Sequence, residues 1–251
     1  MPRSKIFCVG LHKAGTTSLH ALFKSLGLRS THSTRWSRAP LESKVLDRFD
    51  AFSDGGRHFW NEAHEFGGNH ELRGLTERHP DARFILQFRE MRPWLVSKML
   101  HAGWTRDTRP VDGPVDLVHE AWTVKSVHAI HGWIRNRLRY HEAACRYLAS
   151  VPNDVLVVDV TRDADAATKV AEFALPTASL VVRDPFTIVH RAVNHVSPRF
   201  VPSRFPRSNV AGNDPQDREA CREFLEEAIA EMPDFHDDSL EEIRAAVGRT
   251  G

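Results

Sequence analysis

One short segment near the start of the chain combines glycines, a lysine and hydroxyl side chains at a spacing that suits anion binding. An apolar stretch, Lys5 to Val9, leads into a loop bounded by Gly10 and Gly15, and hydroxyl residues follow at once. Glycines let a backbone turn tightly and come close to a ligand, and the first N–H groups of a helix lack intrahelical partners. Those N–H groups and the helix dipole favour an anion, so we predict a phosphate-type ligand between a strand and a helix. The residues predicted to contact this ligand are His12, Lys13, Ala14, Gly15, Thr16, Thr17 and Ser18, with the hydroxyl groups also capping the helix.

The position of the lysine separates two classes of phosphate loop. Nucleoside-triphosphate loops follow the pattern G-x-x-x-x-G-K-[ST], in which the lysine comes directly after the second glycine. Here Thr16 takes that position, and Lys13 stands two residues before Gly15. The glycine spacing is kept, but the lysine of an ATPase is displaced. The run from Lys13 to Ser18 instead resembles the sulfotransferase family, whose 5′-phosphosulfate loop commonly has the form K-x-G-T-T-[ST].

The resemblance implies the P-loop fold of the bacterial-type soluble sulfotransferases. It also implies that the sulfuryl donor is 3′-phosphoadenosine-5′-phosphosulfate (PAPS), with adenosine 3′,5′-bisphosphate (PAP) as the product. The implied reaction moves a sulfuryl group to a hydroxyl or amine of a small-molecule or glycan acceptor. No metal is expected by this resemblance.

A second motif can hold the other end of such a nucleotide. The strand-like run that starts at Arg83 ends in Arg89, and Ser97 follows eight residues later with Pro93 and Trp94 between them. An arginine at the carboxyl end of a parallel strand points into the crevice where such sheets bind ligands, and its planar fork suits a phosphate. In the family that the chain resembles, an arginine and a serine at this spacing contact the 3′-phosphate of the nucleotide.

Sulfuryl transfer needs stabilisation of the leaving phosphate and removal of a proton from the acceptor. Lys13 and the loop N–H groups are placed for the first task. Two residues are candidates for the second: His32 ends a short strand, and Asp54 ends the next one. Histidine suits proton abstraction near neutral pH, and a carboxylate can act as a base or orient the acceptor. The sequence leaves the choice between His32 and Asp54 open.

The order of elements predicts an α/β fold with three layers and a central parallel sheet. Apolar strands alternate with helical tracts, which implies right-handed crossovers with helices on both faces. Strands are predicted near 5–9, 28–32, 50–54, 83–89 and 154–160, and helices near 16–26, 41–49, 59–78, 93–102, 115–148 and 168–173. An exposed loop is predicted at 30–39 and a long irregular loop at about 184–213, ahead of a helical extension at about 214–248. We therefore expect a single domain, 1–251.

Composition narrows the partners. The chain has 251 residues, of which 41% are hydrophobic and 27% charged, and a net charge of +1, which gives no reason to expect nucleic acid. Three dispersed cysteines suit a reducing compartment, no apolar run approaches the length of a membrane span, and a cytoplasmic location is expected.

Two other functions remain open at this point. A nucleotide-dependent kinase with a variant loop would bind ATP with magnesium, although the displaced lysine argues against it. A non-catalytic nucleotide-binding module would bind PAP tightly without turnover. The acceptor and the oligomeric state are not encoded in any motif that we recognise.

Overall fold

Five short parallel strands form the centre of the computed structural model, which describes residues 4–37, 43–55, 70–114, 124–176, 178–183, 187–192, 199–201 and 214–248. The strand order is β2-β3-β1-β4-β5, so β1 is central and its carboxyl end opens between β3 and β4. The strands are β1 (Ile6–Cys8), β2 (Ser30–His32), β3 (Ala51–Ser53), β4 (Arg83–Phe88) and β5 (Val155–Asp159). The predicted parallel sheet is therefore confirmed.

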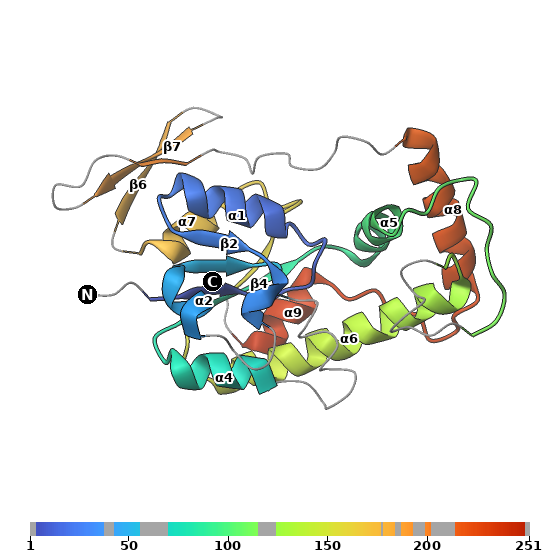
Figure 1. Ribbon diagram of the computed structural model, residues 1–251, viewed down its shortest axis with the longest axis horizontal. Helices are drawn as coiled ribbons and strands as arrows, with labels where there is room; N and C mark the ends of the chain where they lie inside the picture. Colours follow the sequence, from blue (N-terminus) through green and yellow to red (C-terminus); the bar gives the residue numbers. More distant parts are fainter. Residues whose placement is uncertain are drawn as a thin grey trace.

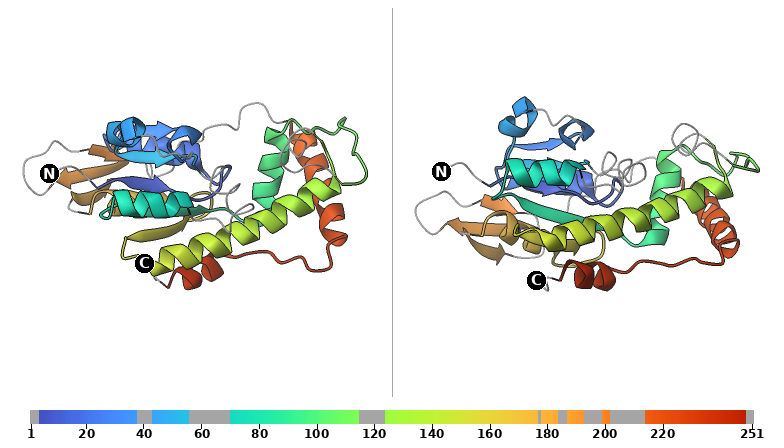
Figure 2. Two further views of the ribbon diagram at one scale, coloured as in Figure 1. Left: turned by 60° about the horizontal axis from the view of Figure 1, so that its bottom comes forward. Right: turned by 90° about the horizontal axis from the view of Figure 1, so that it is seen from below.

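Alternating residues of the strands build two separate cores, one on each face of the sheet. Ile6 and Cys8 face helices α1 (Thr16–Ser25) and α7 (Ala166–Ala174), whereas Phe7 lies in the core of the opposite face. That opposite face is covered by α4 (His70–Arg78), α6 (Val127–Ser150) and α9 (Leu240–Val247) (Figures 1 and 2). This two-residue alternation is the reason that the domain has three layers.

A group of helices extends beyond the carboxyl ends of the strands. Helix α5 (Met91–His101) and helix α8 (Pro215–Ala230) pack together beside the amino-terminal part of α6, and Figure 1 shows this group at the far end from the chain's N-terminus. Trp104 stacks on Trp133 of α6, with ring centroids 5.2 Å apart. The phosphate-type loop after β1 therefore lies between the sheet and this helical group.

Several boundaries differ from the sequence prediction. Helix α5 begins at Met91 and not at Pro93; proline fits there because N–H groups in the first turn need no partner. Helix α6 begins after Ser126, whose side chain accepts from the His128 N–H, and residues 115–123 lie outside the described ranges. Of the predicted helix near 59–78 only α4 is described, and α2 (Ser43–Arg48) falls within the predicted 41–49 helix.

Two predicted loops contain more regular structure than expected. A short 3-10 helix, Thr34–Ser37, lies in the predicted exposed loop. Its Trp36 is fully buried, and the indole N–H donates to the carbonyl of Ser53. A second, antiparallel sheet contains β6 (Ala178–Arg183), β7 (Thr187–Ala192) and β8 (Arg199–Val201). Strands β7 and β8 fall within the predicted irregular loop, where the β-branched run at Thr187 outweighs the turn-forming composition around it.

The predicted carboxyl-terminal helices match α8 and α9. Asp214 caps α8, and Ser239 with Glu242 forms a capping box on α9. None of the helices within the described ranges has an apolar stretch of the length that crossing a bilayer requires.

Candidate functional site

The backbone of the loop after β1 is held by side chains from three neighbouring elements. Gln87, a buried amide in the apolar strand β4, bonds both the N–H and the carbonyl of Gly10 at 2.9 Å. A Cβ at Gly10 would lie 2.1 Å from the carbonyl oxygen of Gln87, so only glycine permits this contact. Further donors bond successive loop carbonyls: Tyr140 of α6 to Val9, Trp94 of α5 to His12 at 2.9 Å, and Arg89 to Lys13 at 3.0 Å. The loop is therefore preorganised without a ligand.

Three residues at this site have left-handed backbone. Gly15 has φ +89°, and a Cβ there would meet Cγ2 of Val160 at 1.9 Å. Lys13 and Asp54 have φ values of 66° and 70° although neither is glycine. Non-glycine residues in this region carry strain that the surrounding structure must hold, and such strain concentrates at functional sites.

Lys13 and Arg89 bring two positive charges to the same place. Burial lowers the pKa of Lys13, the charge of Arg89 lowers it further, and Asp54 partly offsets both. Burial is also the main cause that lowers the pKa of Arg89, where Asp159 opposes the effect and Arg218 of α8 adds to it. The buried Nε of Arg89 makes no hydrogen bond within the described residues. A bound anion would stabilise two positive charges this close together and would accept a hydrogen bond from the unused Nε donor of Arg89.

The two candidate bases face the first turn of α1. The hydroxyl of Thr16 donates to Oδ1 of Asp54 at 3.3 Å, and the hydroxyl of Thr17 lies 3.3 Å from Nε2 of His32. Nε2 of His32 is 3.9 Å from Oδ2 of Asp54, and both side chains keep more than a quarter of their surface exposed (29% and 27%). The structure thus joins His32, Asp54 and the loop hydroxyls in one accessible cluster.

The remaining predicted contacts divide into backbone and side-chain roles. Gly15 stands at the N-cap of α1 and no side chain caps the helix, so the predicted capping by the hydroxyl groups is wrong; those side chains follow the cap. His12 and Ala14 are buried, and the His12 ring lies beside that of Trp94, with centroids 6.3 Å apart. Ser18 is half-buried in the first turn of α1. Ser97 is half-buried on α5, and among the described contacts none joins it to Arg89.

A buried charge network supports Arg89 from behind. Arg137 of α6 donates through Nη2 to the carbonyl of Arg89 at 2.7 Å and pairs with Asp238 at 2.8 Å. His141, one turn further along α6, lies 2.5 Å from the same carboxylate. Burial alone would raise the pKa of Asp238, but the bonds and charges of His141 and Arg137 outweigh it and lower that pKa to about 2. The segment between α8 and α9 is thereby tied to the strand end that carries Arg89.

This network predicts an acid-labile fold. The unfolded Asp238 carboxyl takes up a proton near its ordinary pKa of 3.8, whereas the folded one resists protonation until about 2. Its stabilisation is therefore complete above pH 4 and is lost as the pH falls from about 4 to 2, by up to about 1.4 kcal/mol per pH unit. Burial lowers the pKa of His141 as well, which adds a loss of the same sign below its ordinary 6.5. Urea unfolding between pH 5 and 2 should show this fall in the free energy of unfolding for the wild type and for Asp237→Asn, which removes only the exposed neighbouring carboxyl. A flat profile would contradict the prediction.

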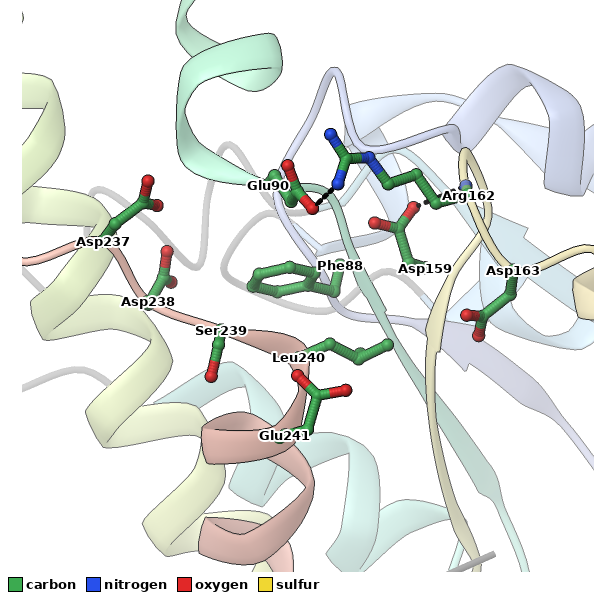
Figure 3. Close-up of a pocket in the computed structure, with 10 residues that line it drawn as sticks. All are labelled: Phe88, Glu90, Asp159, Arg162, Asp163, Asp237, Asp238, Ser239, Leu240 and Glu241. Carbon is green, nitrogen blue, oxygen red and sulfur yellow. Dashed lines mark hydrogen bonds and ion pairs between the residues drawn. The ribbon is translucent and has the colours of Figure 1, made fainter.

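A pocket of about 450 Å³ is lined by Phe88 and Glu90, the two chain neighbours of Arg89, and is strongly acidic (Figure 3). Glu90 and Arg162 form an ion pair across it, and the Oδ1 of Asp159 is occupied by the backbone N–H groups of Thr161 and Arg162. The residues that line it are Phe88, Glu90, Asp159, Arg162, Asp163, Asp237, Asp238, Ser239, Leu240 and Glu241. Six carboxylates oppose one arginine in this lining, so phosphate groups do not fit this pocket.

Three residues of the site were not predicted from the sequence. Gln87 was detectable as the one amide in an apolar strand, and His101 as the residue one helical turn after Ser97. Partial burial lowers the pKa of His101, as does the charge of Lys13, while Asp54 raises it, so its imidazole faces the same cluster. Ser53 contacts His32, and only the parallel pairing of β2 with β3 places it there.

Comparison with known families identifies one match over nearly the whole chain. A family model described as "Sulfotransferase domain" matches residues 5–243. A comparison with curated proteins gives no significant match.

Proposed function

The chain belongs to the sulfotransferase domain family, and we propose that it transfers a sulfuryl group from PAPS to a hydroxyl or amine of a small-molecule or glycan acceptor. The 5′-phosphosulfate lies in the loop from His12 to Ser18, and Arg89 with Ser97 holds the 3′-phosphate. No resident metal takes part in this scheme. A cytoplasmic location and a single domain remain predictions.

The proposal rests mainly on one observation: Lys13 and Arg89, the two cations proposed to bind the phosphate groups, lie next to each other. The Arg89 guanidinium donates to the carbonyl of Lys13, and its charge adds to burial in lowering the pKa of Lys13. A nucleotide with phosphate groups at both the 5′ and the 3′ position offers one anion to each cation. A nucleoside triphosphate lacks the 3′-phosphate that this proposal assigns to Arg89.

The proposed transfer uses the cluster around the first turn of α1. A base takes the acceptor proton, the acceptor oxygen or nitrogen forms a bond to sulfur, and the bond from sulfur to the 5′-phosphate oxygen breaks. The electron pair of that bond stays on the phosphate, where Lys13 and the α1 N–H groups stabilise the charge. His32 and Asp54 both face the place that the acceptor would occupy.

Binding of two nucleotides to two variants tests the donor assignment. PAP and adenosine 5′-monophosphate differ only in the 3′-phosphate, so Arg89→Ala should weaken PAP binding at least about tenfold more than monophosphate binding, as expected for a charged hydrogen bond. Lys13→Ala should weaken both to a similar degree, because both ligands carry the 5′-phosphate. Isothermal titration calorimetry at fixed salt gives the six dissociation constants of the wild type and the two variants.

Arg92→Ala is the matched control. Arg92 is an exposed arginine three residues from Arg89, paired with Glu226 and Asp237, and its loss should change neither affinity. Tighter binding of ATP with magnesium than of PAP would favour the kinase alternative and overturn the proposal. PAP binding with no transfer from radiolabelled PAPS to any member of a panel of phenols, sugars and amines would favour a non-catalytic module.

A further inference from the structure

Ser53 connects β2 and β3 directly behind His32. Its hydroxyl donates to the carbonyl of Thr31 at 3.3 Å, and its oxygen lies 3.1 Å from Nδ1 of His32. The side chain is fully buried, and the Trp36 indole fixes the local backbone through the Ser53 carbonyl. The hydroxyl therefore cannot turn towards solvent.

The direction of the Ser53 hydrogen bond decides which nitrogen of His32 carries the proton. A serine hydroxyl has a single hydrogen, and a backbone carbonyl can only accept. With the hydrogen of Ser53 directed to Thr31, its oxygen offers His32 only lone pairs, which favours the form of His32 with hydrogen on Nδ1. In the neutral ring Nε2 is then the unprotonated nitrogen, and it is the one that faces Thr17 and Asp54.

We propose that Ser53 is a positioning residue that holds neutral His32 in the Nδ1–H form, so that Nε2 of His32 is the base for the acceptor proton. Asp54 then acts on the imidazolium that forms, since its carboxylate lies 3.9 Å from the newly protonated Nε2. The catalytic part of this inference rests on the proposed sulfuryl transfer, whereas the position of the proton does not. The choice between His32 and Asp54, which the sequence left open, falls on His32.

The groups around His32 agree with this assignment. Asp54 accepts the Thr16 hydroxyl on Oδ1, and Nε2 of His32 in the Nδ1–H form accepts the Thr17 hydroxyl at the same distance, 3.3 Å. An imidazole is intrinsically a stronger base than a carboxylate, which favours His32 as the proton acceptor. From α1, His20 approaches with its ring centroid 5.8 Å from that of His32, but its Nδ1 is bonded to the hydroxyl of Ser30 at 2.9 Å. Burial lowers the pKa of His20, and His32 and Lys24 lower it further, so His20 adds no charge at neutral pH.

Nitrogen-15 NMR of the imidazole rings tests the proton position without any substrate. In the wild-type protein above pH 8, His32 should show a protonated Nδ1 and an unprotonated Nε2. Ser53→Ala should shift the ring towards a mixture of the two neutral forms, and Ser53→Thr, which restores a hydroxyl, should return it. Ser30→Ala is the matched control, because it removes the equivalent serine from His20 and should leave the His32 signals unchanged. A wild-type spectrum with hydrogen on Nε2 would overturn the proposal.

Kinetics then separate this inference from the proposed function. The assay uses radiolabelled PAPS and an acceptor from the panel that the wild-type protein has been found to label. Relative to the wild type, Ser53→Ala should lower kcat about tenfold or more, while the dissociation constant for PAP stays within about twofold. An unchanged kcat, with the proton shifted by NMR, would remove the catalytic role of Ser53. If no acceptor is ever labelled but the Nδ1–H form is found, the proposed function fails while the proton assignment stands.

Discussion

Replacing Asp238 with alanine is expected to lower the free energy of unfolding by about 3–5 kcal/mol, the usual cost of leaving a buried charge without its partner. Arg137 is 1% exposed and Asp238 is 6% exposed, so water cannot replace the lost carboxylate. His141 loses its hydrogen-bond partner in the same step. Urea denaturation at pH 7 measures the change directly, and thermal melting gives an independent value.

The neighbouring residue provides the control. Asp237 pairs with Arg92 at 2.6 Å, but these side chains are 39% and 43% exposed, so Asp237→Ala should cost no more than about 1 kcal/mol. Removing both buried charges with Arg137→Met and Asp238→Leu should recover much of the stability, because no lone charge remains. The double variant should still bind PAP more weakly than the wild type, since Arg137 no longer donates to the carbonyl of Arg89. Equal losses for Asp237→Ala and Asp238→Ala would contradict the assignment of a buried network.

Local spacing was sufficient to predict the parts of the site that depend on local backbone. The two glycines, the lysine between them and the helix start all lie within nine residues, so their geometry follows from one strand-loop-helix unit. Arg89 was predictable because it directly follows the apolar strand β4, and strand ends of a parallel sheet share one edge. The sheet itself followed from apolar runs alternating with helical tracts.

Contacts between distant segments were not predictable in the same way. Asp238 is 101 residues from Arg137, and no local pattern marks either residue as buried, since charged residues are usually solvated. Ser53 is an ordinary strand serine until β2 pairs with β3. Strands β7 and β8 were missed because turn-forming residues dominate the composition around them; β7 pairs with β6 on one side and with β8 on the other.

Replacing Gly15 with alanine should weaken nucleotide binding about 100-fold and destabilise the fold. A Cβ 1.9 Å from Cγ2 of Val160 is roughly 2 Å closer than two carbon atoms can pack, so the loop must move. Displacement of that size at a preorganised site costs about 100-fold in ligand affinity or rate. Left-handed strain and overpacking together should lower the free energy of unfolding by about 2–4 kcal/mol. Calorimetry with PAP and urea denaturation measure the two effects separately.

Two further variants distinguish the clash from the backbone strain. Gly103 has φ +83°, close to that of Gly15, but a Cβ there meets nothing within 4 Å, so Gly103→Ala should show only the strain, about 1 kcal/mol, with PAP binding unchanged. Combining Gly15→Ala with Val160→Ala removes the atom that the new Cβ would strike, so PAP affinity should return to within about tenfold of that of Val160→Ala alone. If the double variant binds no better than Gly15→Ala, the backbone conformation of Gly15 and not its closeness to Val160 is what nucleotide binding requires. The loop then needs glycine for its left-handed turn, and its packing against the end of β5 has no part in holding the 5′-phosphosulfate.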